Sequence, residues 1–231
     1  MCGRYFLVSD ADALQAVLGV TRFPAESLTP RYNIAPLQRV PVIVSHHGER
    51  VLGLVRWGLT PAWAASDEDA ARSINARSET VAEKPSFRDA FRLRRCLVPA
   101  DGFYEWRRAT GGARTPMAVR VEGLEPIAFA GLWERWRAPS GEVITSCVIL
   151  TTDAAEEIRS IHDRMPVILD PEAQRTWLDP DATPEQLHEI LAGAAPPLRA
   201  HAVSTLVNAV RNDVPDCLLP VDDAPDLDLF G

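Results

Sequence analysis

Short runs of β-branched, leucine and aromatic residues recur along the chain and are separated by polar turn residues. Such runs are typical of β-strands. Residues 40–45 and 51–57 flank His46-His47-Gly48 and predict a hairpin, in which Pro41 indicates an edge strand because proline has no amide hydrogen to donate. Further strands are expected at residues 95–99, 102–107, 117–121, 126–133 and 143–151.

Helix signals are interspersed among these runs. Ser9 and Asp10 precede the apolar positions Leu14 and Leu18, and Gly19 follows them, which predicts a short capped helix. Further helices are expected at residues 86–93, 152–160, 171–178 and 183–191, the last with the start signal Thr183-Pro184-Glu185.

Strands and helices do not alternate strictly, which favours an α+β fold over a parallel sheet. We expect one domain over residues 1–221, with a curved, mostly antiparallel sheet or a barrel-like β core and peripheral helices. Residues 222–231 are expected to form an acidic C-terminal tail.

The composition is that of an ordinary globular protein, with 46% hydrophobic and 24% charged residues in a chain of 231. No apolar run approaches the length of a membrane span, and no signal peptide is recognised, so a cytoplasmic, nucleoid-associated location is expected. The four cysteines are far apart, which argues against a zinc site or a disulfide framework. We expect a monomer without metal or cofactor.

The formal net charge of −8 argues at first against a nucleic-acid partner. The charge is unevenly distributed, however. Residues 150–231 carry 16 acidic and 5 basic side chains, which leaves 16 acidic and 19 basic ones in residues 1–149. Nearly all the basic residues are arginine, which suits bidentate phosphate contact, although a GC-rich genome explains an arginine excess equally well.

Cys2 stands directly behind the initiator methionine, so removal of Met1 would make it the N-terminal residue. An N-terminal cysteine carries a thiol and an α-amine on adjacent carbons, with ordinary pKa values of about 8.5 and about 7.7–8.0. The amine can attack an aldehyde to give an imine, and the sulfur can then close a thiazolidine ring. Alternatively, a cysteine stands at position 2 by chance, in a disordered terminus, and has no chemical role.

Three segments place polar residues where packing alone does not require them. Asn75 lies in Asn75-Ala76-Arg77-Ser78-Glu79, which resembles a site loop more than a packed element, although a turn cap would also explain it. Glu105 shares a strand face with Phe103. It is either a surface charge or a buried carboxyl with a raised pKa, suited to general acid/base work. His162 follows an expected helix and could transfer protons near neutral pH or cap that helix.

Several ordered motifs together resemble the SRAP family, the SOS-response-associated peptidase-like proteins that process abasic sites in DNA. The resemblance covers nearly the whole chain, apart from the acidic tail and from Leu206 and Ala209, where more polar residues would be expected. Its marks are Met1-Cys2-Gly3-Arg4-Tyr5, Arg31-Tyr32-Asn33-Ile34-Ala35-Pro36, Arg56-Trp57-Gly58-Leu59 with Pro61 and Trp63, Asn75-Ala76-Arg77-Ser78-Glu79, Arg95-Cys96-Leu97-Val98-Pro99, Gly102-Phe103-Tyr104-Glu105-Trp106, Phe129-Ala130-Gly131-Leu132-Trp133, His162-Asp163-Arg164-Met165-Pro166, and Val203-Ser204 with Val207-Asn208 and Asn212-Asp213.

The resemblance implies a protein of the DNA damage response that recognises abasic sites in single-stranded DNA and traps the ring-opened aldehyde as a thiazolidine on Cys2. It implies catalytic roles for Cys2, Asn75, Glu105 and His162, and DNA contacts for Arg4, Arg77, Arg164 and Trp63. Replication or repair proteins would be its partners. Lyase action by β-elimination and autocatalytic removal of Met1 are implied side activities.

Two alternatives use the same residues differently. Cys2 with its own amine as base is also the arrangement of N-terminal-nucleophile amidohydrolases and thiol peptidases. The arginines could instead serve a protein that binds damaged or modified DNA without any covalent step.

Overall fold

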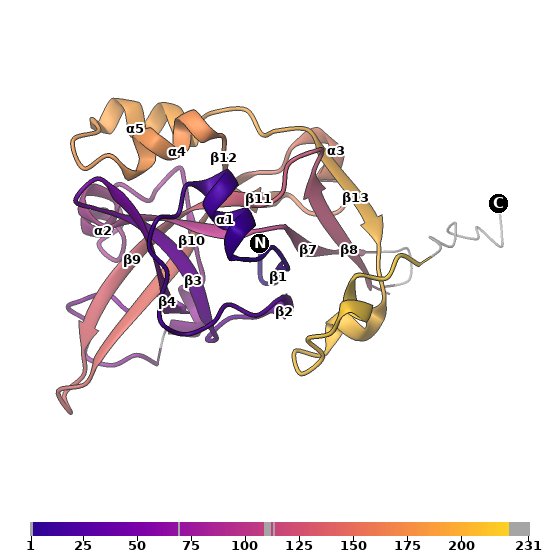
Figure 1. Cartoon of the computed structure of the whole chain (residues 1–231), viewed down its shortest axis with the longest axis horizontal. Coiled ribbons are helices and arrows are strands. Elements are labelled where there is room, and N and C mark those ends of the chain that lie inside the picture. The colour runs from indigo at the N-terminus through magenta and orange to yellow at the C-terminus, as the bar shows by residue number, and fades with distance from the viewer. Residues whose placement is uncertain (1, 69, 109–111, 113, 222–231) are drawn as a thin grey trace.

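Five strands close into a barrel in the computed structural model, which describes residues 2–68, 70–108, 112 and 114–221 (Figure 1). Around the barrel the strands follow in the order β4 (Glu49–Trp57), β3 (Arg39–His46), β6 (Arg95–Ala100), β9 (Ile127–Arg137) and β10 (Val143–Asp153). Each strand pairs with the next, and the pairing of β10 with β4 closes the circuit. The β4–β10 pairing is parallel and the other four are antiparallel.

The hairpin predicted around Gly48 is confirmed as β3 and β4. His47 and Gly48 have φ values of 52° and 80°, the left-handed conformation that a tight two-residue hairpin requires. The prediction that Pro41 marks an edge strand is wrong, because β3 lies between β4 and β6. Pro41 is opposite Leu54 on β4, whereas β6 is reached at Ile43, so proline costs the sheet little at this position.

A second, antiparallel sheet brings the amino terminus into the fold. Its order is β13 (Leu198–Ala202), β8 (Arg114–Val121), β7 (Gly102–Arg108), β1 (Tyr5–Leu7) and β2 (Arg31–Ile34). Gly102 faces Phe6, and a Cβ there would lie 2.4 Å from Cζ of Phe6 and 2.5 Å from the carbonyl oxygen of Val119. Glycine therefore allows β1 to approach β7 closely.

The helices lie on the outside of the barrel, with α4 and α5 together at one end (Figure 1). In α1, Asp10 accepts a hydrogen bond from the amide of Ala13, and Gly19 ends the helix at φ 65°. Thr183 and Gln186 form a reciprocal capping box on α5. The helices are α1 (Ala11–Leu18), α2 (Arg88–Leu93), α3 (Glu156–Arg159), α4 (Pro171–Leu178) and α5 (Pro184–Leu191), with 3-10 turns η1 (Ala70–Arg72), η2 (Thr205–Asn208) and η3 (Pro215–Leu218).

The structure confirms the α+β class and the barrel-like core, and it corrects two further local predictions. Residues 152–160 were expected to be helical, but β10 continues to Asp153 and only Glu156–Arg159 forms a helix. The expected loop at Asn75 begins with strand β5 (Asn75–Arg77), which pairs in parallel with β10. Its partner is about 75 residues away in sequence, so no local pattern could reveal the pairing.

Two short strands follow α3: β11 (Arg164–Pro166), which pairs with β10, and β12 (Ile168–Leu169), which pairs with β9. All four cysteines are buried and free of disulfides. Within the described part of the chain, no helix is both long and apolar enough to cross a membrane, and no cluster of metal-ligating side chains occurs. The predicted tail, residues 222–231, lies outside the described residues.

Candidate active site

Cys2 enters the fold because it leads directly into β1, which is hydrogen-bonded to β7. Tyr5 is opposite Phe103 in this pairing, and the amide of Tyr104 donates to the carbonyl of Arg4 at 2.9 Å. This register brings the start of the chain alongside Glu105. Cys2 has no solvent-exposed surface, and its thiol lies 3.9 Å from the carbonyl oxygen of Arg4. Cys2 is therefore held in the protein interior.

Asn75 holds the backbone of Cys2. Its side-chain Nδ2 donates a hydrogen bond of 2.7 Å to the carbonyl oxygen of Cys2. The other side-chain atom, Oδ1, is buried and accepts no hydrogen bond from the residues that the structure describes. An unsatisfied buried acceptor is costly in a folded protein, so Oδ1 is placed to receive a donor from another molecule or from a newly formed amine.

Glu105 is a buried carboxyl, as the alternation along its strand allowed. The residue is 5% exposed and lies on the same face of β7 as Phe103, whereas Tyr104 and Trp106 pack in a separate small core on the other face. Burial raises the pKa of Glu105 to about 7, and the nearby charge of Asp163 also raises it. A carboxyl with this pKa can both donate and accept a proton near neutrality.

The thiol of Cys2 remains protonated at neutral pH. Burial is the main cause that raises its pKa, and the negative charge of Glu105 raises it further. The pairing of β1 with β7, in which Tyr5 is opposite Phe103, likewise brings the segment that begins with Cys2 toward Glu105. Nucleophilic attack by the sulfur therefore requires a base, and Glu105 is suitably placed to act as one.

The raised pKa of Glu105 predicts how stability depends on pH. The folded protein binds this proton more tightly than the unfolded chain, so the contribution to stability is complete below about pH 4.5 and is lost as pH rises through about 7. The corresponding cost at pH 8 is about 3 kcal/mol. Glu105→Gln should therefore raise the free energy of unfolding at pH 8 by up to this amount and change it little at pH 4.5.

Urea unfolding of both proteins at the two pH values measures this effect. The same pH dependence in the variant and the wild type would contradict the inferred burial of an ionisable carboxyl.

His162 lies in the turn between α3 and β11. Its Nδ1 accepts a hydrogen bond of 2.9 Å from the amide of Arg164, and the same atom lies 2.8 Å from Oδ1 of Asp163. The amide contact requires a neutral ring, whereas the Asp163 contact becomes an ion pair when the ring is protonated. Burial lowers the pKa of His162 and outweighs the opposing effect of Asp163, so we favour the neutral ring with its proton on Nε2.

Arg77 and Trp63 are the accessible members of the predicted DNA-binding set. Arg77 is exposed and, by strand alternation, lies on the same face of β5 as Asn75. Trp63 is 65% exposed, which suits a surface on which bases stack.

Arg4 is partly buried, and one of its terminal nitrogens makes hydrogen bonds within the protein. That Nη1 donates to Oδ1 of Asn33 and to the carbonyl of Val207, both at 2.7 Å, and the guanidinium lies 5.6 Å from the ring centre of Trp106. Its predicted phosphate contact stays a prediction.

A role in contacting DNA phosphates suggested an exposed Arg164, but the structure buries this residue. It is 8% exposed, and its guanidinium donates to Glu79, to Asp153 and to the carbonyl oxygen of Thr151. These contacts place Glu79 of the Asn75 motif in the site, a role that the sequence did not indicate.

Asn33 and Asp213 are further residues for which the sequence indicated no role, although both occur in the motifs. Asn33 is fully buried, and its Nδ2 donates to the carbonyl oxygens of Val207, Ala209 and Asn212 at 2.6–3.2 Å. Asp213 accepts hydrogen bonds from the amides of Tyr32 and Asn33 and from Arg31. These hydrogen bonds hold residues 205–213 next to Arg4.

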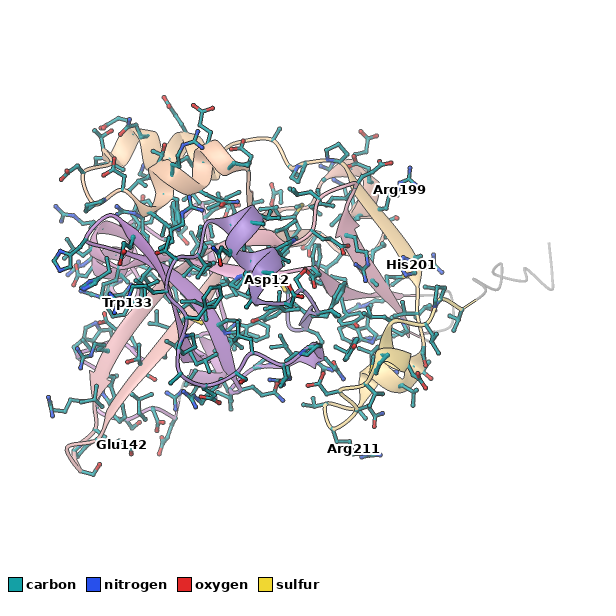
Figure 2. The ribbon with its side chains drawn as sticks, viewed as in Figure 1. Asp12, Trp133, Glu142, Arg199, His201 and Arg211 are labelled. Carbon is teal, nitrogen blue, oxygen red and sulfur yellow. The ribbon has the colours of Figure 1, made fainter. Side chains whose placement is uncertain are left out.

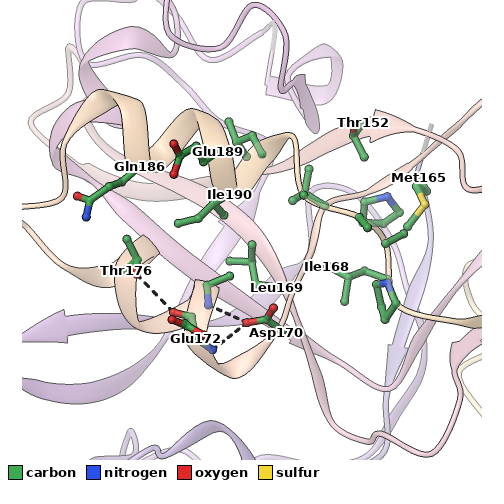
Figure 3. A pocket seen from close by; sticks show the side chains of 18 of the residues that line it. Thr152, Met165, Ile168, Leu169, Asp170, Glu172, Thr176, Gln186, Glu189 and Ile190 are labelled. Carbon is green, nitrogen blue, oxygen red and sulfur yellow. Dashed lines mark hydrogen bonds between the residues drawn. The ribbon is translucent and has the colours of Figure 1, made fainter.

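A hollow of about 500 Å³ lies elsewhere, between α4, α5 and the strand region 165–169 (Figure 3). Met165, Ile168 and Ile190 line it together with the carboxylates Asp170, Glu172 and Glu189. None of the eight predicted site residues is among its described lining residues. This hollow is therefore not formed by the candidate site residues.

Comparison with known proteins finds related chains that match most of this one. Residues 1–210 match the family described as SOS response associated peptidase (SRAP). The abasic site processing protein YoqW of Bacillus subtilis is 40% identical over 221 residues, covering 94% of this chain and 99% of its own. The abasic site processing protein HMCES of Gallus gallus is 35% identical over 225 residues, covering 84% of this chain and 67% of its own. A crystal structure of a Bacteroides thetaiotaomicron protein superposes with a TM-score of 0.84 at 28% identity and covers 95% of this chain and 100% of its own.

Proposed function

This chain belongs to the SOS response associated peptidase (SRAP) family, and on that premise we propose that it recognises abasic sites in single-stranded DNA and links to them covalently through Cys2. The curated relatives named as abasic site processing proteins support the substrate class. One observation carries the proposal: Cys2 is buried with Asn75 on its carbonyl oxygen and with the carboxyl of Glu105, whose pKa is about 7, as its neighbour.

The reaction begins after Met1 has been removed, which turns the amide nitrogen of Cys2 into an α-amine. An abasic deoxyribose is mostly a closed hemiacetal, so a proton must leave the anomeric hydroxyl and another must reach the ring oxygen. We assign this transfer to His162, whose Nε2 would donate its proton to the ring oxygen and take up the proton that leaves the anomeric hydroxyl, while Nδ1 keeps its hydrogen bond from the Arg164 amide. The product is an open-chain aldehyde.

Covalent capture then needs two further steps. The α-amine adds to the aldehyde carbon, and the resulting carbinolamine loses water when Glu105 supplies a proton to the departing hydroxyl. Loss of water leaves an iminium, whose nitrogen keeps its hydrogen. The sulfur of Cys2 adds to the iminium carbon and its proton passes to the Glu105 carboxylate, which leaves a neutral ring nitrogen and restores the carboxyl. One water is released and no oxidant is consumed. Oδ1 of Asn75 would orient the amine or a sugar hydroxyl by accepting its hydrogen.

DNA is held in this proposal by contacts that do not depend on the base sequence. Arg77 would contact a phosphate next to the lesion, Trp63 would stack on a neighbouring base, and Arg4 and Arg164 would assist at the flanking phosphates. The excess of arginine over acidic residues in residues 1–149 supports such contacts. Because an abasic position has no base, sequence preference should be weak and binding should fall as salt is added.

Two side reactions belong to the same proposal. The imine can lose the 3′ phosphate by β-elimination, which is lyase chemistry, and closure of the thiazolidine would prevent this strand break. Removal of Met1 by the protein itself would be the peptidase activity to which the family description refers. We place these reactions in the cytoplasm, at the nucleoid, where a monomer would cooperate with replication or repair proteins.

Intact-protein mass spectrometry tests the central step. The purified chain is incubated with a single-stranded oligonucleotide whose single uracil has been removed by a glycosylase. The expected product has the mass of the protein without Met1 plus that of the oligonucleotide minus one water. The same oligonucleotide with its uracil intact is the control. Binding without any covalent product would contradict the proposal and would favour a non-covalent DNA-binding protein.

A further inference from the structure

Arg164 is held by two carboxylates that approach it from the solvent side. Its Nη1 donates to Oε1 of Glu79 and to Oδ1 of Asp153, both at 2.6 Å, and its Nη2 donates to Oε2 of Glu79 at 2.9 Å. Nη2 also donates to the carbonyl oxygen of Thr151 at 2.6 Å. The guanidinium therefore has a bidentate partner in Glu79 and a single contact with Asp153.

The exposures of the three side chains set the order in which a ligand would meet them. The side chain of Arg164 is 10% exposed, that of Glu79 is 47% exposed and that of Asp153 is 84% exposed. A phosphate approaching from solvent would thus meet the carboxylates before it met the guanidinium. Asp153 is held by one contact and is mostly hydrated, so it is the more easily displaced partner.

The net charge of the three groups opposes an anion. Hydrogen bonding by Arg164 lowers the pKa of Glu79, which keeps this carboxyl ionised at neutral pH. Two carboxylates and one guanidinium together carry one negative charge. A phosphate would be repelled unless a carboxylate moved away, whereas an arginine with one carboxylate partner would be electrically neutral.

We propose that Asp153 is a specificity-determining residue that occupies Arg164 as an internal substitute for a DNA phosphate and so weakens the non-covalent binding of undamaged single-stranded DNA. This inference rests on the proposed function. Asp153 is 84% exposed and makes only one contact with Arg164, so a phosphate that is also held at other points can displace it. Affinity for intact strands is then kept low, and selectivity for abasic DNA comes from the covalent step at Cys2.

The test removes the charge of Asp153 and keeps its shape. Binding of a fluorescent oligothymidylate without a lesion is measured by anisotropy over a series of salt concentrations. Asp153→Asn should lower the dissociation constant about three- to tenfold at low salt, as expected for one charge removed within about 5 Å of a phosphate. The salt dependence should steepen by about 0.7 in log–log slope for one phosphate gained on a single strand.

A matched control separates this effect from a general change of charge. Glu157→Gln removes one negative charge from the neighbouring helix α3, where Glu157 is exposed, and should change the affinity much less. In an Arg164→Gln background, Asp153→Asn should bring no gain, because the arginine to be released is absent. Thermal unfolding verifies that each variant is folded, and Asp153→Ser is a second neutral variant.

The inference is overturned if Asp153→Asn leaves the affinity unchanged or weakens it, or if the gain is equally large for Glu157→Gln or in the Arg164→Gln background. Such results with an intact covalent reaction on abasic DNA would refute this inference alone. A wild-type protein that neither binds single-stranded DNA nor forms the adduct would refute the proposed function instead.

Discussion

Cys2→Ala should abolish the heat-stable adduct with abasic single-stranded DNA. Without sulfur no thiazolidine can close, so only an imine can form on the α-amine, and an imine is hydrolysed on heating. The α-amine of alanine is still formed when the initiator methionine is removed, so strand cleavage by β-elimination should persist or increase. Denaturing gel electrophoresis of the heated reaction measures both products, because the adduct migrates slowly and the cleaved strand migrates fast.

Cys96→Ala is the matched control for this experiment. Cys96 is as fully buried as Cys2 but lies on β6 of the barrel, so its loss should leave the adduct yield unchanged. An N-terminal tag that cannot be cleaved keeps the thiol and removes the α-amine, and it should also block the adduct. A stable adduct in Cys2→Ala, or an undiminished yield with the tag attached, would contradict thiazolidine capture.

Glu105→Gln should slow adduct formation by about 100- to 10,000-fold, the usual range for a group that transfers protons in the transition state. In the wild type the carboxyl is protonated below pH 7, which favours loss of water, and ionised above pH 7, which favours deprotonation of the thiol. The rate should therefore pass through a maximum near pH 7. Glutamine can neither donate nor accept this proton, so the variant should lose that dependence.

Initial rates of adduct formation between pH 5 and 9 measure the effect, at DNA concentrations that saturate each protein. Glu142→Gln is the matched control, since Glu142 lies at the tip of the β9–β10 hairpin, well away from the amino terminus (Figure 2). A wild-type rate in Glu105→Gln would exclude the proton-transfer role. The amide is close in size to the acid, and the variant should be more stable at high pH, so a loss of rate would not reflect unfolding.

Local patterns were sufficient for most of the barrel. The hairpin of β3 and β4, the strands β6 to β10 and the capped helices α1 and α5 were predicted because their signals lie within a few residues: alternation, turn residues and side-chain caps. The strands that were missed, β1, β2, β5, β11 and β13, have three to five residues each. Such short segments become strands only through the partners beside them.

For the site residues too, the sequence shows which side chains are available, and the tertiary structure shows which groups surround them. The sequence alone determined which chemistry is available: a cysteine that Met1 removal makes terminal, a glutamate on the Phe103 face of its strand, and a histidine after a helix. Only the tertiary structure decided that burial raises the pKa of Glu105 to about 7, that Asn75 holds the carbonyl oxygen of Cys2, and that Arg164 is engaged by Glu79 and Asp153. The physical reason is that burial and hydrogen bonding depend on which distant segments meet, and here β1, β5, β7 and β11 meet through non-local pairings that no local pattern encodes.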